Sequence, residues 1–374
     1  MKYSIPKMID INSAPKNGYK GISLFAGGGG SSTGYKIAGF DILMASEFIK
    51  NAADTYRANH PTTHVIEKDI RETSGDEILN MINMKRGELD LFDGSPPCAP
   101  FSLLSRNREG KKGNIVKYSE TKQRVDDLYD EYVRLVLEIQ PKVLVSENVE
   151  GITKGAAKKF LYSNILEPLS KDYNLEYKVL KAKYLGVPQN RPRFILIGVR
   201  KDLGNSPAFP QENKNDVISV REAWDGMVQD EDQRQMLIDK CLYYYDKQYM
   251  IISKIPKNPK KSIDGSYVFN GARKNFNMIR ISYDNPANTI TSRAWEIAFG
   301  SGLYHPEEDR KLTIPELKRI HSYPDDYILT GSYEKQYERI ARSVPPLMMA
   351  SVANTIKKEI LDKIGKNSIM NDII

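Results

Sequence analysis

Five short, largely apolar runs mark the first part of the chain, and amphipathic stretches separate them. Runs of this length are typical of strands that are buried in a sheet. Strands that alternate with helical patterns favour an α/β fold with a doubly wound, mainly parallel sheet. The expected strands are Ile22–Phe25, Ile42–Ala45, Leu89–Phe92, Val143–Val145 and Phe194–Val199.

The clearest helical pattern lies between the third and fourth of these runs and ends before Pro141. Its apolar residues recur at spacings of three and four, which places them on one face of a helix. That face comprises Val125, Leu128, Tyr129, Tyr132, Val136 and Ile139.

The pattern becomes irregular near Asp202, and periodicity returns at Thr313–His321 and at Pro346–Ile364. We therefore expect a catalytic and cofactor-binding domain at residues 1–201 and a smaller domain at 202–300. Residues 301–374 are expected to return to the first domain. The length of 374 residues suits one large domain with a smaller one.

Composition limits the classes of protein to consider. The only two cysteines, Cys98 and Cys241, cannot build a disulfide framework or a zinc cluster, which favours a reduced, cytoplasmic protein. Residues 1–20 are polar, and no apolar run reaches membrane length, so we expect no membrane partner. The four histidines form no metal-binding pattern, and we expect no metal cofactor.

The formal net charge is +7, and two segments concentrate basic residues. Lys254–Arg280 holds seven basic residues and one acidic residue, and Arg106–Arg124 holds seven basic and two acidic residues. A single run of this kind usually forms a solvated surface. Two runs that flank one candidate site indicate a phosphate backbone as the partner.

A glycine-rich segment, Gly27–Gly30, follows the first expected strand and precedes a helical pattern. Such a turn brings backbone N–H groups and a helix N-terminus close to a ligand. It is not a P-loop, because Tyr35 and Lys36 follow Gly34, and it lacks the dinucleotide-binding spacing. A ligand-binding loop and a plain tight turn remain equally good interpretations.

Acidic residues follow the neighbouring strands. Glu47, at the end of the second strand, is placed to hold ribose hydroxyl groups. Asp69 follows a third strand and could bind an adenine amino group. Glu147 follows the fourth apolar run, where a carboxylate can act in the crevice of the sheet, although a solvated strand-end acid is the alternative.

Cys98 stands in the segment Asp93–Ser102, directly after two prolines. The prolines fix the backbone and present the sulfur in one direction, which favours a nucleophile over a buried, inert thiol. Farther along, Arg191 and Arg193 occupy alternate positions of an extended segment. They could clamp a phosphate or contact a base edge, or they could be ordinary surface arginines.

Taken in order, these motifs resemble the cytosine-5 DNA methyltransferase family of restriction–modification type. The matching strings are FAGGGG, Glu47, Asp69, PPCAPFS, ENV, QNRPR, PANTI, LTIPEL and SVPP. Each string is weak alone, but the ordered set is specific. The resemblance covers roughly residues 20–200 and 280–360 and implies a Rossmann-like methyltransferase domain with a small, irregular target-recognition domain.

The resemblance implies S-adenosyl-L-methionine as the methyl donor and S-adenosyl-L-homocysteine as the product. It implies that a cytosine is flipped out of double-stranded DNA, that the Cys98 thiolate adds to C6, and that Glu147 holds N3 and the exocyclic amine. Arg193 is expected to contact O2 of the base, and Arg191 to orient the loop or bind a phosphate. The implied cofactor-binding residues are Phe25, Gly27, Gly28, Gly29, Gly30, Glu47, Phe48, Asp69, Ile70, Pro97, Leu128, Ser343 and Val344.

Candidate DNA-binding residues follow from the mobile loop of the family and from the recognition segment. They are Ser102, Arg106, Arg108, Gln189, Arg273 and Lys274. One departure concerns Ala341 and Arg342, which stand where the family has Gly-Asn. Arg342 cannot accept a hydrogen bond as Asn does, but it can pair with the carboxylate of the cofactor.

Two alternatives remain open at this point. A related branch of the family methylates tRNA, and it carries a Cys-Phe-Thr element that is absent here, although Cys241-Leu242 begins similarly. A catalytically silent DNA-binding relative is the other alternative, and the presence of Cys98 and Glu147 argues against it. We expect a monomer in a bacterial or phage-infected cell, associated with the nucleoid through DNA.

Overall fold

The computed structural model of the chain describes residues 3–97, 115–118, 121–125, 127–243, 252–265, 278–292 and 302–364. Two compact units make up the fold. The first, here called the sheet unit, comprises Ile11–Leu180, Pro192–Gln211 and Met349–Ile374. The second unit comprises Met1–Asp10, Lys181–Arg191 and Glu212–Met348. The predicted domain boundaries stay a prediction.

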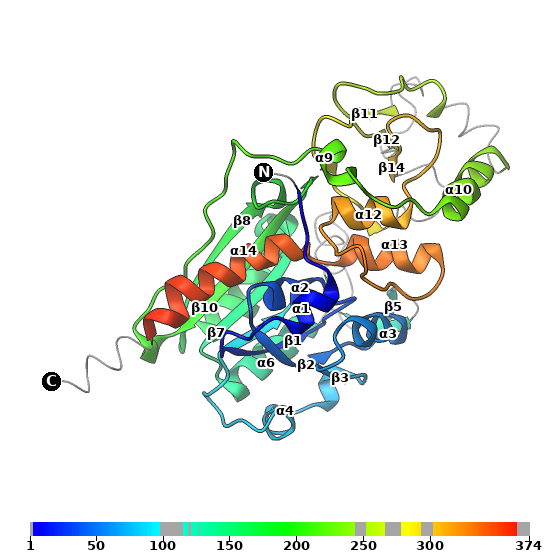
Figure 1. Cartoon of the computed structure of the whole chain (residues 1–374). Helices are drawn as coiled ribbons and strands as arrows, with labels where there is room; N and C mark the ends of the chain where they lie inside the picture. Colours follow the sequence, from blue (N-terminus) through cyan, green and yellow to red (C-terminus); the bar gives the residue numbers. More distant parts are fainter. Residues whose placement is uncertain are drawn as a thin grey trace. The chain divides into compact units, whose positions relative to one another are not determined.

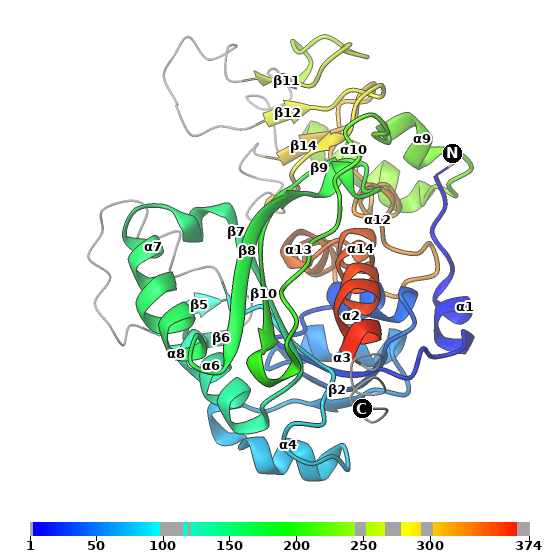
Figure 2. The same ribbon diagram turned by 90° about the vertical axis from the view of Figure 1, so that its left-hand side faces the viewer.

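Seven strands form the central sheet in the order β3-β2-β1-β4-β7-β10-β8 (Figures 1 and 2). Neighbours from β3 to β7 are parallel, and β10 runs antiparallel to β7. This arrangement confirms the predicted α/β fold with a mainly parallel sheet. The strands are β1 (Lys20–Leu24), β2 (Asp41–Ser46), β3 (His64–Ile66), β4 (Leu91–Gly94), β7 (Val143–Val149), β8 (Tyr173–Lys181) and β10 (Pro192–Arg200).

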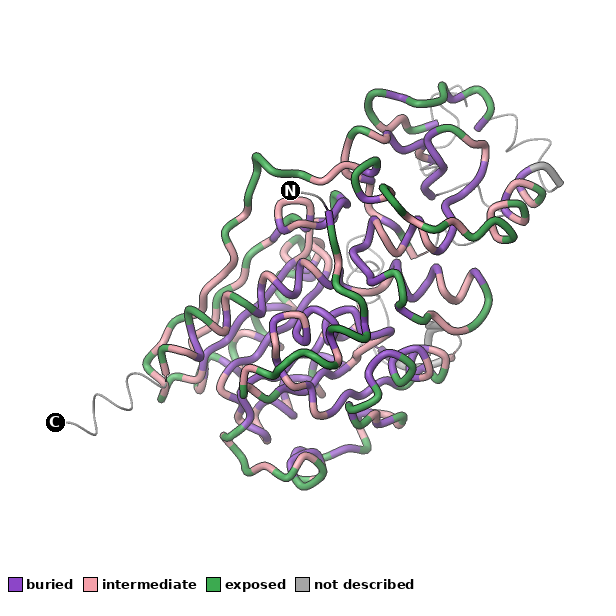
Figure 3. Tube along the Cα trace, in the orientation of Figure 1, coloured by how far each residue is buried: buried purple, intermediate pink, exposed green. Residues whose placement is uncertain are grey.

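Helices cover both faces of this sheet, with α6, α7 and α8 on one face and α2 and α14 on the other (Figure 2). Strands β1, β2, β4, β7 and β10 are buried along most of their length, whereas β3 and β8 are more exposed (Figure 3). The helices are α1 (Met8–Ser13), α2 (Gly30–Ile37), α3 (Lys50–Asn59), α4 (Gly75–Met81), α6 (Leu128–Ile139), α7 (Gly155–Phe160), α8 (Glu167–Leu169) and α14 (Pro346–Ile356).

Short segments follow several of these strands and helices, and one of them, the turn at Ala182–Tyr184, belongs to the second unit. The 3-10 turns are η1 (Ile70–Glu72), η2 (Glu150–Thr153), η4 (Ala182–Tyr184) and η5 (Lys201–Leu203). Two π-helical segments, η3 (Leu161–Leu166) and η9 (Lys357–Leu361), precede α8 and follow α14. β5 (Ile115–Tyr118) and β6 (Thr121–Arg124) form an antiparallel pair.

The order of the strands fixes where a ligand can bind. From β1 the chain builds outward to β2 and β3, and it then returns to β4 on the other side of β1. In open parallel sheets the crevice at such a reversal, beyond the carboxyl ends of the strands, is the usual ligand site. The glycine-rich segment follows β1, and the two prolines before Cys98 follow β4, so both lie at this reversal.

The second unit is built from short elements. β11 (Ile263–Asp264), β12 (Met278–Arg280) and β14 (Gly302–Tyr304) form one small sheet, and β9 (Gln189–Asn190) pairs with β13 (Ala287–Asn288). Its helices are α9 (Val220–Trp224), α10 (Glu231–Tyr243), α12 (Ile314–Ile320) and α13 (Tyr333–Arg342).

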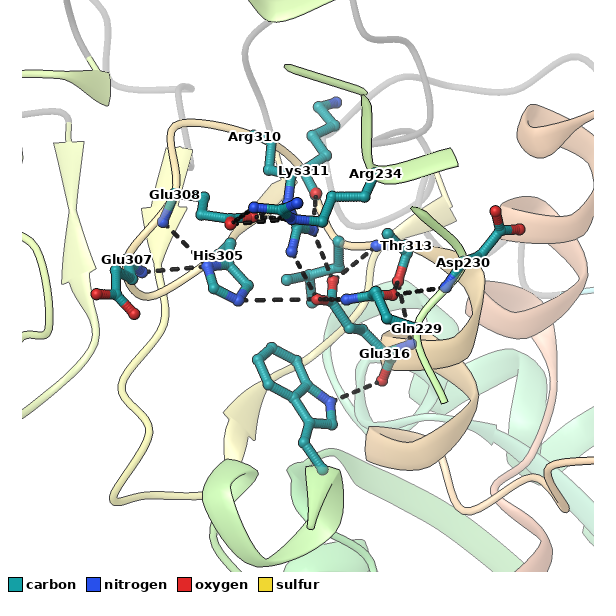
Figure 4. Close-up of polar contacts among 12 residues, drawn as sticks. Gln229, Asp230, Arg234, His305, Glu307, Glu308, Arg310, Lys311, Thr313 and Glu316 are labelled. Carbon is teal, nitrogen blue, oxygen red and sulfur yellow. Dashed lines mark hydrogen bonds and ion pairs between the residues drawn. The ribbon is translucent and has the colours of Figure 1, made fainter. Parts of the chain in front are cut away.

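A partly buried ion-pair network links elements of the second unit (Figure 4). Glu316 is 1% exposed and accepts hydrogen bonds from both terminal nitrogens of Arg310, at 2.8 and 2.7 Å. Arg310 also contacts Glu308, which in turn binds Arg234 of α10. These contacts hold the pKa of Glu308 down at about 2, although burial alone would raise it. A network of this kind, with each charge paired, links α10 to α12 and fixes the loop between β14 and α12.

Candidate active site

The glycine-rich segment forms an open loop between β1 and α2. Gly29 precedes the helix in the left-handed conformation (φ 88°) and makes no side-chain capping bond. Gly27 also has a positive φ of 56°, and a Cβ atom there would meet nothing within 4 Å. Glycine is therefore required at position 27 by the backbone conformation and not by crowding. A helix N-terminus without a side-chain cap, beside open space, suits a polar ligand.

Glu47 fixes this loop from the end of β2. Its Oε2 accepts a hydrogen bond from the backbone N–H of Gly27 at 2.8 Å, and its Oε1 accepts one from Ile49 at 2.7 Å. Glu47 is 8% exposed, whereas the adjacent Phe48 is 41% exposed. Each carboxylate oxygen has two lone pairs, so a carboxylate that binds backbone N–H groups can also accept from hydroxyl groups.

Asp69 lies after β3 and caps η1, where it accepts a hydrogen bond from the N–H of Arg71 at 3.1 Å. The guanidinium group of Arg71 pairs with Asp69 at 2.8 Å and with Asp127 at 2.5 Å. Asp127 directly precedes Leu128, the first residue of α6, so the Arg71 bridge ties the predicted cofactor residue Asp69 to the start of that helix. Ile70 and Leu128 are both 4% exposed.

Glu147 and Arg193 form an ion pair at the carboxyl end of β7, with Arg193 Nε 2.8 Å from Glu147 Oε1. The register of the antiparallel pair β7–β10 places Ile195 beside Glu147 and Arg193 beside Val149. Side chains alternate along a strand, so Glu147 and Arg193 point to the same face. Both side chains are 11% exposed, which leaves a charged pair with limited access to solvent.

The backbone before Cys98 is tied to β7 by Asn148. The Asn148 side chain donates to the carbonyl oxygen of Pro96 at 3.2 Å and to the hydroxyl of Tyr129 at 2.9 Å. Pro97 is the last described residue of this segment, and Cys98 lies outside the described residues. Asn148 and Tyr129 therefore hold the segment that leads to the predicted nucleophile.

Four further predicted residues, Gln189, Arg191, Ser343 and Val344, belong to the second unit. Arg191 is 1% exposed and donates to the carbonyl oxygens of Ile290, Ala341 and Ser343 at 3.1, 2.7 and 2.9 Å. Arg191 and Arg193 thus bind different partners, although they are only two residues apart. Arg191 fixes the backbone around Ser343, whereas Arg193 pairs with a carboxylate.

His321 links Gln189 with Ser343 in the same unit. Its Nδ1 lies 3.0 Å from Gln189 Nε2, and its Nε2 lies 3.0 Å from Ser343 Oγ. Gln189 and His321 are fully buried, and Val344 is 5% exposed. Arg342, at the position that departs from the family pattern, pairs with Glu338 of α13 at 2.7 Å.

The roles of all these residues stay predictions, and five further candidates lie outside the described residues. They are Ser102, Arg106, Arg108, Arg273 and Lys274. Sequence reasoning did not single out Arg71 and Asp127, and it placed Tyr129 on a helix face without a role at the site. The Arg71–Asp127 and Tyr129–Asn148 partners are 56 and 19 residues apart in the sequence, so no local motif marks them.

The other cysteine is a core residue. Cys241 is 7% exposed and packs with Ile252, Ile255, Met278 and Tyr304 in the second unit. Burial raises the pKa of its thiol to about 11, which suppresses the thiolate needed for nucleophilic attack. Cys98 is therefore the stronger candidate nucleophile.

The described residues lack a metal-binding cluster and a membrane-spanning helix. Within the described ranges, no cluster of His, Cys, Asp and Glu side chains is placed to hold a metal ion. Among the helices that the structure describes, none is long and apolar enough to cross a bilayer.

The chain is similar to known DNA methyltransferases. The family described as "C-5 cytosine-specific DNA methylase" matches residues 19–358. Type II methyltransferase M1.HphI of Haemophilus parahaemolyticus is 30% identical over 344 residues, which cover 90% of this chain and 86% of that protein. Type II methyltransferase M.Eco47II of Escherichia coli is 30% identical over 371 residues, which cover 96% and 83% of the two chains.

Solved structures share the fold. A putative DNA modification methyltransferase encoded within an Escherichia coli prophage matches with a TM-score of 0.69 at 19% identity, covering 92% of this chain and 99% of that one. A mutant of Spodoptera frugiperda DNMT2 matches with a TM-score of 0.62 at 15% identity, covering 91% and 100%. At these identities the likeness concerns the fold alone.

Proposed function

Because this chain belongs to the C-5 cytosine-specific DNA methylase family, we propose that it methylates C5 of a flipped-out cytosine in duplex DNA through a covalent Cys98–C6 adduct. The chain is a DNA (cytosine-5) methyltransferase of restriction–modification type, since it belongs to this family and its relatives are Type II methyltransferases. The observation that carries the proposal is the Glu147–Arg193 pair, which lies at the carboxyl end of β7 beside the strand that leads to Cys98.

Glu147 has the chemistry that a cytosine ring needs for activation. In its protonated form the carboxyl group donates to N3 of the base, and its carbonyl oxygen accepts from the exocyclic amine. Protonation of N3 withdraws electrons from C6, so the Cys98 thiolate can add there. The electron pair of the C5–C6 double bond then moves to C5, which becomes the nucleophile.

Arg193 holds Glu147 in place before the base arrives. Its Nε is 2.8 Å from the carboxylate, and its Nη1 donates to the carbonyl oxygen of Pro192 at 2.7 Å. A guanidinium group carries five N–H donors, so Arg193 can also donate a hydrogen bond to a base oxygen such as O2 of cytosine. Once C5 carries the methyl group it loses its proton to a base, the C5–C6 double bond re-forms, and the Cys98 thiolate leaves with the electron pair of the C–S bond.

The loop after β1 fits the methyl donor that the family implies, S-adenosyl-L-methionine, which when bound supplies an electrophilic methyl group. Gly27 borders open space, and the N-terminus of α2 carries no side-chain cap, as a ligand with a carboxylate end requires. Glu47 would hold the ribose. Phe48, Asp69 and Ile70 would hold the adenine, and Ser343 and Val344 are further candidate contacts.

The target base must leave the DNA stack, because its C5 and C6 cannot be reached inside the duplex. The basic segment Arg106–Arg124 would close over the flipped base, and Lys254–Arg280 would contact the phosphate backbone. We propose that one protein chain acts on one target cytosine, in a bacterial or phage-infected cell.

Transfer of a labelled methyl group tests the proposal directly. We expect the purified protein to label duplex DNA and not tRNA, and bisulfite sequencing should place 5-methylcytosine in one short recognition sequence. A Cys98→Ser variant should lose transfer while its affinity for S-adenosyl-L-methionine, measured by calorimetry, stays within about twofold of the parent. Label in tRNA alone, or full activity of the variant, would overturn the proposal.

A further inference from the structure

Two aspartates three residues apart, one just before β4 and one within it, have opposite surroundings. Asp90 accepts a hydrogen bond from Lys142 Nζ at 2.8 Å and one from the backbone N–H of Lys20 at 2.8 Å. Asp93 is 1% exposed and has no ion pair with any residue that the structure describes. Its partners are two hydroxyl groups, Ser23 Oγ at 2.7 Å and Tyr35 OH at 3.0 Å.

Strand register places Asp93 in a line with the catalytic candidates. Ser23 of β1 is paired with Asp93, and Asp93 is paired with Val145 of β7. Glu147 is two residues beyond Val145, and Arg193 is diagonal to Glu147 on β10. Because side chains alternate along a strand, all four polar residues point to one face of the sheet. We call Ser23, Asp93, Glu147 and Arg193 the polar row.

The polar row puts charges of opposite sign on the two sides of Glu147. Arg193 is a permanent cation on one side, at 2.8 Å. Asp93 is a carboxyl group on the other side, at a diagonal separation of roughly 7 Å. Arg193 favours the ionised form of Glu147, whereas an ionised Asp93 disfavours it.

Asp93 can change its charge in the neutral range. Burial raises its pKa to about 7, the hydroxyls of Ser23 and Tyr35 oppose that rise, and the negative charge of Glu147 adds to it. Within the described ranges, the other titratable groups whose electrostatics involve Asp93 are phenols, Tyr132 on α6 and Tyr56 on α3. Burial raises the pKa of each of these phenols far above neutrality, so neither competes for the proton.

We propose that Asp93 is a positioning residue for the proton on Glu147: its negative charge offsets the pull of Arg193 and keeps Glu147 able to donate to the base. This inference rests on the proposed function, in which Glu147 must carry a proton when it meets N3. A buried carboxylate without a cation lowers the stability of the fold. Packing therefore does not explain why an aspartate stands at position 93, whereas a role at the neighbouring site does.

The test compares the pH dependence of methyl transfer in Asp93→Asn with the parent and with Asp90→Asn. Removal of the Asp93 charge lets Glu147 lose its proton at lower pH. We expect the alkaline limb of kcat to move down by about one pH unit, since two charges roughly 7 Å apart interact on that scale at a partly buried site. Asp90→Asn should leave the limb unchanged, because Asp90 faces Lys142 at the other end of the strand.

The Tyr35→Phe variant tests the role of Asp93 without replacing Asp93 itself. Loss of the Tyr35 hydroxyl removes one bond that favours the ionised form of Asp93, so Asp93 stays protonated to higher pH. The alkaline limb should move in the same direction as in Asp93→Asn, by a smaller amount. If Asp93→Asn fails to fold, the Tyr35→Phe profile decides the question.

The outcomes separate this inference from the proposed function. Parent protein that transfers no methyl group to DNA would overturn the proposed function itself. An active parent whose profile superimposes on those of Asp93→Asn and Tyr35→Phe would overturn the role of Asp93 alone. A shift in both variants, with none in Asp90→Asn, would establish it.

Discussion

The charged side chains at the two ends of the central strands are paired in different ways. At the amino end, Asp90 pairs with Lys142, and Arg200 donates to the carbonyl oxygens of Gly87 and Gln140. At the carboxyl end, Arg193 pairs with Glu147, and Asp93 has only hydroxyl partners among the described residues. At the amino end, the charged side chains therefore have charged or backbone partners. At the carboxyl end, the carboxyl groups can still change protonation state or bind a ligand.

Strand β10 spans both ends, because it runs antiparallel to its neighbour β7. Arg193 near its start lies at the carboxyl end of β7, and Arg200 at its finish lies at the amino end. The same residue type thus holds a candidate catalytic carboxylate at one end and backbone carbonyls at the other. The comparison predicts that substitutions at the carboxyl end change catalysis, while those at the amino end lower stability and leave catalysis unchanged.

The largest expected effect belongs to Glu147→Gln. The amide cannot transfer a proton to N3, so we expect kcat to fall by about 10³-fold or more, within the range seen when general acid–base groups are removed. Single-turnover methyl transfer with saturating DNA measures this effect. Glu150→Gln, which removes an exposed pair with Lys154, is the matched control and should keep parental activity. Near-normal kcat in Glu147→Gln would exclude Glu147 as the proton donor.

The pH dependence of stability should distinguish Asp93 from Asp90. Because the pKa of Asp93 is raised to about 7 in the folded state, the folded protein binds the proton more tightly than the unfolded chain. Its contribution to stability is therefore fully present below about pH 4 and is lost as the pH rises through about 7. Asp93→Asn should stabilise the protein by about 2–4 kcal/mol at pH 8 and by little at pH 4.

Asp90→Asn, in contrast, should destabilise the protein at neutral pH. It removes a charged acceptor from Lys142 and from the N–H of Lys20, which costs about 1–3 kcal/mol. Urea unfolding of both variants and the parent across pH 4–8 provides the measurement. Equal pH dependence in Asp93→Asn and the parent would show that Asp93 does not titrate in this range.

The strands and the acidic residues that follow them could be predicted from the sequence. The apolar runs predicted five strands close to their observed positions, and Glu47, Asp69 and Glu147 were each expected at the end of a strand. These predictions need only local pattern and the rule that parallel strands share one ligand-binding edge. Strand β8 was not predicted, because polar residues such as Glu176 interrupt its apolar pattern. Likewise α6 begins at Leu128, so Val125 lies before the helix.

Pairings between distant residues were not predictable in the same way. The Glu147–Arg193 pair depends on the antiparallel register of β7 and β10, which no motif encodes. The Arg71 bridge and the surroundings of Asp93 depend on the order of strands and helices in space. Asp93 stood in the Pro-Pro-Cys segment without an assigned role, because its burial and lack of a cation among the described residues are properties of the fold.

A smaller effect should separate the two arginines of β10. Arg193→Ala removes the partner of Glu147, and we expect kcat to fall by about 10²-fold while stability changes little, because a charge on Glu147 can be neutralised by protonation. Arg200→Ala removes bonds to Gly87, Gln140 and Asp202 and should cost about 1–3 kcal/mol of stability without a change in kcat. Steady-state kinetics and thermal unfolding on both variants test the pair. Equal losses of activity would contradict the division between the two ends.

The smallest expected effect compares two glycines of the sheet unit. Gly18 and Gly27 both have positive φ, at 90° and 56°, and a Cβ atom would meet nothing within 4 Å at either position. Alanine should therefore cost about 1–2 kcal/mol of stability at both sites through backbone strain alone. Of the two, only Gly27 lies in the proposed cofactor loop, so the backbone strain of Gly27→Ala should also shift that loop and weaken binding of S-adenosyl-L-methionine by about tenfold, as a loss of about 1.4 kcal/mol implies. Calorimetric titration of both variants separates the two effects, and equal affinities would place the cofactor away from this loop.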